Sequence, residues 1–241
     1  MTNVIPHPTI ALLRSSSLAS VAQQEIERII LAGEIPLGAR LTEAWLSERL
    51  GVSRGPIREA FRRLEEAGLV RQEKNRGVFV REIPLDEALE IFDLRAVMDE
   101  LVGRRLAETI TPAQLKSLRA AVERMEQAAR AGDADEYHLQ NLQFHDALVD
   151  YAGNRKMAAV YRKLVKELAL FRRRNLADPS MLPHSASEHR AIVKAIAAGN
   201  PEEAGRAMYD HVMESKQRTM RGQDRPPIAG RTRNGRKVRT A

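Results

Sequence analysis

The sequence predicts a mainly α-helical protein made of two domains. Residues 18–67 carry short helical patterns separated by glycine-containing turns, and two β-compatible runs follow, at 69–73 and 78–82. From residue 85 to about residue 220 the hydrophobic period is helical, with no strand pattern. A chain of 241 residues, 43% of them hydrophobic, is long enough for two modest cores. The expected segments are a disordered N-terminus at 1–17, a first domain at 18–81, a helical domain at 82–220 and a disordered basic tail at 221–241.

The first domain has distinct helix boundaries. Three helices are expected, at about Leu18–Ala32, at Glu43–Leu50 and at Arg54–Ala67. Thr42 and Ser53 are placed to cap the second and third helices, and Gly51 ends the second. Asn75 and Gly77 suit a tight turn between the two β-compatible runs. Three helices followed by a β-hairpin give a winged helix-turn-helix arrangement.

The third of these helices has two different faces. Arg54, Arg58 and Arg62 are four residues apart and align on one face, while the apolar residues between them face the first two helices. Those apolar residues are Ile57, Phe61 and Leu64. An arginine can donate two hydrogen bonds to a guanine in the major groove, so this face predicts DNA binding. The alternative is a solvated amphipathic helix whose arginines pair with Glu59 and Glu66.

The position along the helix assigns a role to each predicted contact. Arg54 and Arg58 lie nearest the N-terminal end and are assigned to base readout, whereas Arg62 is assigned to phosphates. The free N–H groups of the first turn can bind a phosphate, and glycine and proline are tolerated there. A further arginine lies at the tip of the hairpin. The predicted DNA-contacting residues are Ser53, Arg54, Gly55, Pro56, Arg58, Arg62, Arg76 and Gly77.

The stretch GVSRGPIREAFRRLEEAGLV, followed by NRGVFV, resembles the DNA-binding domain of GntR-type transcriptional regulators. The preceding segment, LAGEIPLGARLTEAWLSERL, is similar to the same family. The resemblance covers about residues 18–81 and implies sequence-specific binding to double-stranded DNA. Ala44 lies where fatty-acid-responsive members have an arginine that contacts DNA, so that contact is expected to be absent.

The second domain is predicted to be an all-α antiparallel bundle of about six helices. The expected helices are Leu85 to about Glu108, one from the capping box Thr111–Gln114 to Gly132, one opened by Asp133, one from about Arg155 to Leu176, Ser185–Ala198, and Pro201 to about Met220. Within the bundle, Asn141 and His145 are four residues apart and share a helix face. His189 and His211 lie at similar distances from the last turn, which places them level with each other.

Three imidazoles at matching heights suit Zn²⁺ or Ni²⁺, which nitrogen ligands bind well. The alternative is that each histidine is an ordinary core or surface residue. NLQFHDAL, SEHRAIVKAIAAGNPEEAGRAMYDHV and FDLRAVMDELVGRRLA resemble the FCD effector domain of the FadR-like branch of the GntR family. That resemblance implies a homodimer, a divalent metal held by one Asp and three His, and a small carboxylate beside the metal. His145, His189 and His211 match the three His positions, whereas Asn141 stands where Asp is usual.

Arg95 is our candidate for pairing with an anionic effector, and the alternative is a surface ion pair with Asp99. The net charge of +7 arises mostly from residues 221–241, which carry seven basic side chains and one acidic one. Such a tail either holds nucleic acid without reading its sequence or is simply solvated. The chain has no cysteine, and no run approaches the roughly 20 apolar residues that a membrane span needs, so we expect a cytoplasmic protein.

These observations predict a dimeric, ligand-responsive transcriptional regulator that binds a palindromic operator. Whether it represses or activates stays open. The main alternative is an enzyme in which zinc activates water and Glu188 or Asp146 acts as the base, but no second catalytic cluster or phosphate loop accompanies the histidines. A winged helix that serves only protein contacts would leave the arginine face unexplained.

Overall fold

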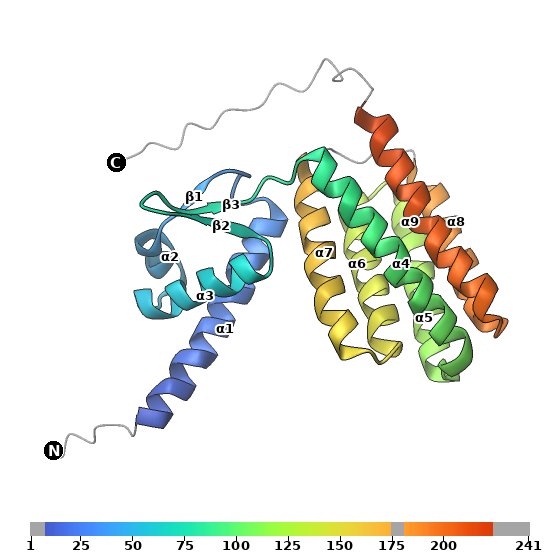
Figure 1. The fold of residues 1–241 in the computed structure, drawn as a ribbon, viewed down its shortest axis with the longest axis horizontal. Helices are drawn as coiled ribbons and strands as arrows, with labels where there is room; N and C mark the ends of the chain where they lie inside the picture. Colours follow the sequence, from blue (N-terminus) through green and yellow to red (C-terminus); the bar gives the residue numbers. More distant parts are fainter. Residues whose placement is uncertain (1–7, 175–180, 224–241) are drawn as a thin grey trace.

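The computed structural model describes residues 8–174 and 181–223, and helices dominate that part of the chain (Figure 1). The N-terminal domain consists of α1 Pro8–Ala32, β1 Arg40–Leu41, α2 Glu43–Leu50, α3 Arg54–Glu66, β2 Val70–Glu73 and β3 Gly77–Val80. The strands form an antiparallel sheet in the order β1-β3-β2, with Arg40 opposite Phe79 and Val70 opposite Val80. The predicted winged helix-turn-helix is confirmed, with one additional strand.

The boundaries of α2 follow from the residues that flank it. The hydroxyl of Thr42 accepts a hydrogen bond from the backbone N–H of Trp45 at 3.3 Å, which caps the first turn. Gly51 ends the helix with φ of 64°, a left-handed conformation that glycine adopts without strain. Asn75, at φ of 61°, makes the tight turn between β2 and β3. These three local predictions are therefore confirmed.

Two elements of this domain differ from the sequence prediction. Helix α1 begins at Pro8, whereas residues 1–17 were expected to be disordered. Proline is tolerated at a first helical position, and no glycine or proline interrupts the chain between Pro8 and Gly33, so the helix continues through the serine-rich stretch. Strand β1, Arg40–Leu41, was not predicted because two residues carry no detectable period.

The C-terminal domain is the predicted helical bundle. Its helices are α4 Leu85–Thr109, α5 Pro112–Ala131, α6 Ala134–Tyr151, α7 Arg155–Arg174, α8 Leu182–Ala197 and α9 Pro201–Gln223. The capping box at the start of α5 is confirmed: Thr111 Oγ1 accepts from the Gln114 backbone N–H, and the Gln114 side chain accepts from that of Thr111. The last two helices are longer than predicted, with α8 beginning at Leu182 and α9 reaching Gln223.

Helices α4 and α9 cross at close range because glycine occupies the crossing point. A Cβ added at Gly103 would lie 2.4 Å from the backbone oxygen of Ala204, so no larger residue fits there. The bundle core around this crossing includes Leu106, Phe144 and Leu148, all fully buried. This close contact fixes the position of α9, the helix that carries His211.

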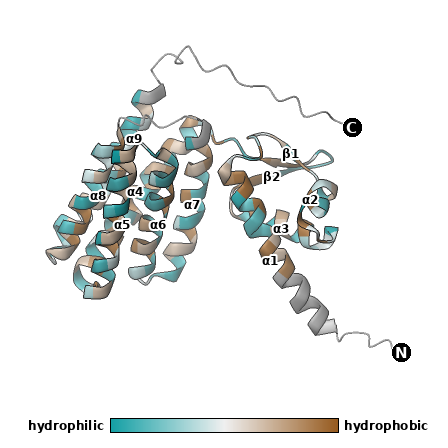
Figure 2. Cartoon of the chain, turned by 180° about the vertical axis from the view of Figure 1, so that it is seen from behind, coloured by the Kyte–Doolittle hydropathy of each residue, from teal (hydrophilic) through white to brown (hydrophobic). Residues whose placement is uncertain are grey.

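Helix α7 of the bundle packs against the N-terminal domain, beside which it lies in Figure 1. Its Leu168 and Phe171 belong to the same hydrophobic core as Ile83 and the N-terminal helices. Arg81, just after β3, donates to Glu167 of α7 at 2.9 Å. Figure 2 shows α7 between the rest of the bundle and the N-terminal domain, with hydrophilic and hydrophobic residues alternating along it. The two domains therefore share a continuous apolar contact.

None of the described helices combines the length and the hydropathy that crossing a membrane would require. The predicted disordered segments fall mainly at residues 1–7 and 224–241, which lie outside the described residues.

Candidate nucleic-acid interface and metal centre

Helix α3 has the two faces that its sequence predicts. Ile57, Phe61 and Leu64 are buried against the N-terminal core, whereas Arg54, Arg58 and Arg62 are all exposed. The N-terminal end of the helix is also open to solvent, since Ser53 and Gly55 are exposed. A Cβ added at Gly55 would meet nothing within 4 Å, so a phosphate can approach the backbone there.

Two details of this helix start differ from the prediction. Ser53 occupies the N-cap position in an extended conformation, but its side chain makes no capping hydrogen bond, so the predicted cap is wrong. Pro56 is buried, so it supports the first turn from inside and does not line the exposed face. Its contact with DNA stays a prediction.

Carboxylates of the same domain already pair with most of the exposed arginines. Glu43 pairs with Arg58 at 2.9 Å, and Glu59 pairs with both Arg62 and Arg63 at 3.3 Å. Arg76, at the hairpin tip, pairs with Glu73. Within the described residues, Arg54 has no ion pair. Arg63 also donates to Ser20 of α1 at 2.7 Å, so it helps to hold the domain together.

A groove runs between α3, the start of α2 and the hairpin. It is lined by four basic residues, Arg40, Arg58, Arg62 and Lys74, and by three acidic ones, Glu43, Glu65 and Glu73. Gly77, with φ of 109°, lies at the edge of this groove beside the guanidinium of Arg40. The groove thus joins the predicted reading helix to the predicted wing.

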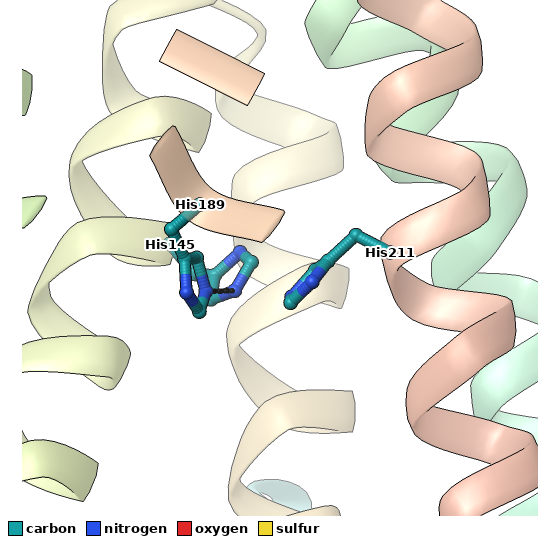
Figure 3. A group of neighbouring side chains, drawn as sticks. All are labelled: His145, His189 and His211. Atoms are coloured by element: carbon teal, nitrogen blue, oxygen red, sulfur yellow. Dashed lines mark hydrogen bonds between the residues drawn. The ribbon is translucent and has the colours of Figure 1, made fainter. Parts of the chain in front are cut away.

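The structure brings the three predicted histidines together inside the bundle (Figure 3). His145 comes from α6, His189 from α8 and His211 from α9, and all three are buried. One nitrogen from each ring lies within 4.8 Å of the others, and the Nε2 atoms of His145 and His189 are 3.3 Å apart. Asn141, also buried, lies one turn before His145 on α6.

Each imidazole has an oxygen partner at Nδ1. The hydroxyl of Tyr161 lies 3.5 Å from Nδ1 of His145, and the hydroxyl of Tyr137 lies 3.4 Å from Nδ1 of His189. Nδ1 of His211 is 2.8 Å from a carboxylate oxygen of Glu188. Contacts of this kind fix the ring orientation and leave Nε2 as the nitrogen available to a metal.

Burial sets the charge state of this cluster. It lowers the pKa of His145 and His189 well below the ordinary value of about 6.5, and it lowers the pKa of His211 as well. Burial alone would raise the pKa of Glu188, but hydrogen bonds from His211 and Arg218 hold it at about 2. Neutral imidazoles oriented by an ionised carboxylate are in the form that binds a divalent metal.

Arg95 lies in the protein interior. The predicted ion pair with Asp99 is present, but it is buried and does not lie at the surface as expected. Pairing of Arg95 with an anionic effector stays a prediction. Arg95 Nη2 lies 3.3 Å from a carboxylate oxygen of Asp99, and its Nε donates to the hydroxyl of Tyr161 at 3.1 Å. Burial raises the pKa of Asp99 to about 6. Arg95 is thus linked through Tyr161 to His145.

Sequence reasoning missed Tyr137, Tyr161 and Arg172 as members of this site. Arg172 of α7 donates to Ser215 of α9 at 3.3 Å, and burial together with Arg95 and Arg218 lowers its pKa to about 10. Both tyrosines fit the helical hydrophobic pattern and carry no separate signal in the sequence. Only the packing of α6, α7 and α8 turns their hydroxyls toward the histidines.

Two family models match the chain. The model of bacterial regulatory proteins of the gntR family matches residues 18–80, and the FCD domain model matches residues 90–214. The probable D-xylose utilization operon transcriptional repressor of Paenarthrobacter nicotinovorans is 30% identical over 200 residues, which are 83% of this chain and 88% of that protein. This chain is a GntR-family transcriptional regulator with an FCD domain.

Other relatives of this GntR regulator agree with that assignment. The gluconate operon transcriptional repressor of Bacillus licheniformis is 34% identical over 143 residues, covering 59% of this chain and 58% of that protein. A solved GntR regulator from Rhodococcus sp. RHA1 is 26% identical, with a TM-score of 0.71 over 86% of this chain and 97% of that one. E. coli McbR/YncC, at 20% identity and a TM-score of 0.76 over 86% and 99% of the two chains, shares the fold. The matched families and the named repressors are transcriptional regulators and not enzymes, which answers the enzyme alternative.

Proposed function

We propose that this GntR regulator binds a palindromic operator as a homodimer and represses transcription until a small carboxylate binds beside a metal in its FCD domain. Repression is supported by the relatives, several of which are named as operon repressors. The exposed arginine face of α3 supports direct DNA reading, with Arg54 and Arg58 at base edges and Arg62 at phosphates. Arg76, at the hairpin tip, would reach an adjacent groove or its backbone.

The three-histidine cluster is the observation that carries the proposed effector site. Two nitrogens bound to one zinc ion at about 2.0–2.1 Å lie at most about 4.2 Å apart, and the 3.3 Å between His145 Nε2 and His189 Nε2 satisfies that limit. One nitrogen of His211 lies within 4.8 Å of the ligand atoms of the other two histidines, close to that limit. We infer that these histidines hold Zn²⁺ or Ni²⁺, with Asn141 contributing a neutral oxygen or orienting a ligand.

Cationic groups and a buried ion pair near the histidines support a carboxylate effector. Arg95, Arg172 and Arg218 each lower the pKa of one or more of the histidines, so their positive charges act on the same volume. Arg95 Nη2 and a carboxylate oxygen of Asp99 form an ion pair at 3.3 Å, but within the described residues neither this nitrogen nor either oxygen of Asp99 makes a well-formed hydrogen bond. An effector that carries both a carboxylate and hydroxyl groups would satisfy both of these residues. The gluconate operon repressor among the relatives fits this class.

An exposed apolar stripe on α4 supports the homodimer. Leu94, Val97 and Leu101 are 59%, 63% and 51% exposed and follow one another at helical spacing. Val160 of the neighbouring helix α7 is 54% exposed. A second copy related by a twofold axis would cover this stripe with the same stripe, as closed dimers do. A twofold protein in turn favours a palindromic operator.

Mass spectrometry of protein purified under native conditions tests the effector site. The protein should carry about one divalent metal per chain and a small acid, and removing the acid should change affinity for a DNA duplex selected by the wild-type protein from a randomised library. Metal-supplemented protein that contains no metal, and whose DNA affinity is the same with and without each candidate acid, would overturn the effector site. Arg54→Ala and Arg58→Ala variants that still bind the selected duplex normally would overturn the assigned reading helix.

A further inference from the structure

Arg58 is held by a carboxylate on a different helix. Its Nε lies 2.9 Å from each oxygen of Glu43, which is the first residue of α2. The contact therefore joins the two helices of the helix-turn-helix across fifteen residues of sequence. Because the bond uses Nε, it leaves both terminal nitrogens of the guanidinium available. The Arg58 side chain is 60% exposed, so those nitrogens face solvent on the reading face.

Glu43 is itself a well-fixed anchor. It directly follows Thr42, whose capping bond to Trp45 fixes the first turn of α2. A carboxylate in a first turn is also stabilised by the positive end of the helix dipole. The Glu43 side chain is only 33% exposed, in the groove between α3 and the hairpin. Arg58 is thereby held in one direction before any DNA is present.

A guanine is recognised by two parallel hydrogen bonds from one arginine, so the arginine must be held in a defined orientation. A free arginine side chain loses rotamer entropy on being fixed, and a carboxylate partner reduces that loss at the moment of binding. We propose that Glu43 is a specificity-determining positioning residue, which directs the two terminal nitrogens of Arg58 to a guanine in each half-site. The inference rests on the proposed reading of DNA by α3.

The other ion pair on this face has a different geometry. Arg62 pairs with Glu59, three residues earlier on its own helix, at 3.3 Å and through a terminal nitrogen. Exposed pairs of that type contribute little and occupy the group that would contact DNA. Among Arg54, Arg58 and Arg62, only Arg58 pairs with a residue of another described helix. That pair also leaves the terminal nitrogens of the arginine open.

The proposal predicts that Glu43→Ala affects affinity for random DNA and affinity for the selected duplex differently. A carboxylate beside a phosphate backbone is repelled by it, so Glu43→Ala should leave affinity for random DNA unchanged or raise it. Affinity for the selected duplex should instead fall, lowering the ratio of specific to random binding by roughly 3- to 10-fold, a part of the about 5- to 150-fold that one bidentate contact provides. Libraries selected anew with Glu43→Ala should show a weakened guanine preference at one position per half-site.

Two further variants separate a positioning role of Glu43 from a general effect of removing a carboxylate or of poor folding. Glu34→Ala is the matched control, because Glu34 also pairs with an arginine of α2, Arg49, and its side chain is 36% exposed; its specificity ratio should equal that of the wild type. Glu43→Gln retains an oxygen that accepts from Nε, so its ratio should lie between those of wild type and Glu43→Ala, even if the alanine variant folds poorly.

The possible results are distinct. Equal changes on selected and random DNA in both Glu43 variants would overturn the positioning role, provided that Arg58→Ala still loses the selected duplex. An Arg58→Ala variant with an unchanged ratio would overturn the reading role of Arg58, and with it the role of Glu43. A reduced ratio in Glu43→Ala, with normal thermal unfolding and a normal Glu34→Ala control, supports the proposal.

Discussion

Nδ1 of His211 lies 2.8 Å from Oε2 of Glu188, and this contact determines which nitrogen of the imidazole can bind a metal. An ionised carboxylate accepts the Nδ1–H, so Nε2 is left as the lone-pair nitrogen. Arg218 donates to both oxygens of Glu188, at 3.0 Å for Oε2, which holds the carboxylate in place. The orientation of His211 thus depends on Glu188 and Arg218, neither of which is a proposed metal ligand.

Replacing Glu188 by alanine should weaken metal binding without removing any ligand. Loss of a partner that orients a ligating histidine typically costs about 10- to 100-fold in metal affinity. Competition with a chelator of known zinc affinity measures the change. Glu126→Ala is the matched control, because the Glu126 side chain is 14% exposed, close to the 13% of Glu188, and also holds an arginine, Arg190. Equal zinc affinity in Glu188→Ala and Glu126→Ala would remove Glu188 from the proposed site.

The ligand set itself is tested at Asn141. Asn141→Asp adds a negative oxygen one turn from His145 and should tighten metal binding, because a carboxylate attracts a divalent cation more strongly than an amide does. His189→Ala and His211→Ala should instead lower metal content and the response to the effector. Their metal-free binding to the selected duplex should stay close to that of wild type, since α3 belongs to the other domain. Unchanged zinc affinity in Asn141→Asp would show that this side chain does not contact the ion.

The parts of the fold that could be predicted are those bounded by capping residues and turn-forming glycines. Thr42 and Gly51 bound α2, and Thr111 with Gln114 opens α5, because capping bonds and left-handed glycines act within a few residues. Strand β1 could not be predicted, because it exists only through its pairing with β3.

The interior of the FCD domain shows a second reason why prediction failed. On α4 the polar Arg95 and Asp99 are buried, whereas Leu94 and Val97 are exposed, which reverses the usual hydrophobic pattern. The buried ion pair beside the histidines and the exposed apolar face both depart from that pattern, as the proposed effector site and the proposed dimer would require. Sequence periodicity registers apolar positions without showing which of two surfaces they will face.

Metal-free protein should lose stability as the pH falls below about 6.5. Burial lowers the pKa of His145 and His189 in the folded state, so below the ordinary value of about 6.5 the unfolded chain binds protons that the folded chain does not. The free energy of unfolding should then fall by about 1.4 kcal/mol per pH unit for each such histidine. Urea unfolding of chelator-treated protein between pH 7.5 and 5.5 measures the slope. His189→Gln should show a shallower loss, and a slope equal to that of wild type would contradict the assignment.

The apolar stripe of α4 predicts a dimer that a single charge can break. Val97 is 63% exposed at the centre of Leu94, Val97 and Leu101, so in a twofold dimer it would be buried near its own copy. Val97→Asp would then bury two like charges close together, which costs far more than either charge in water. We expect wild-type protein to sediment as a dimer at micromolar concentration and Val97→Asp as a monomer, with weaker binding to the full palindrome and little change on a single half-site.

The matched control for this prediction is Leu139→Asp. Leu139 lies on α6, is 49% exposed and is not part of the stripe, so the same substitution there should leave the dimer intact. Analytical ultracentrifugation compares the two variants at equal concentration. If both remain dimeric, subunits pair through a different surface; if both dissociate, the effect is a general one of added charge. Dissociation of Val97→Asp alone places the dimer interface on α4, because the charge, the exposure and the chemistry of the two substitutions are otherwise alike.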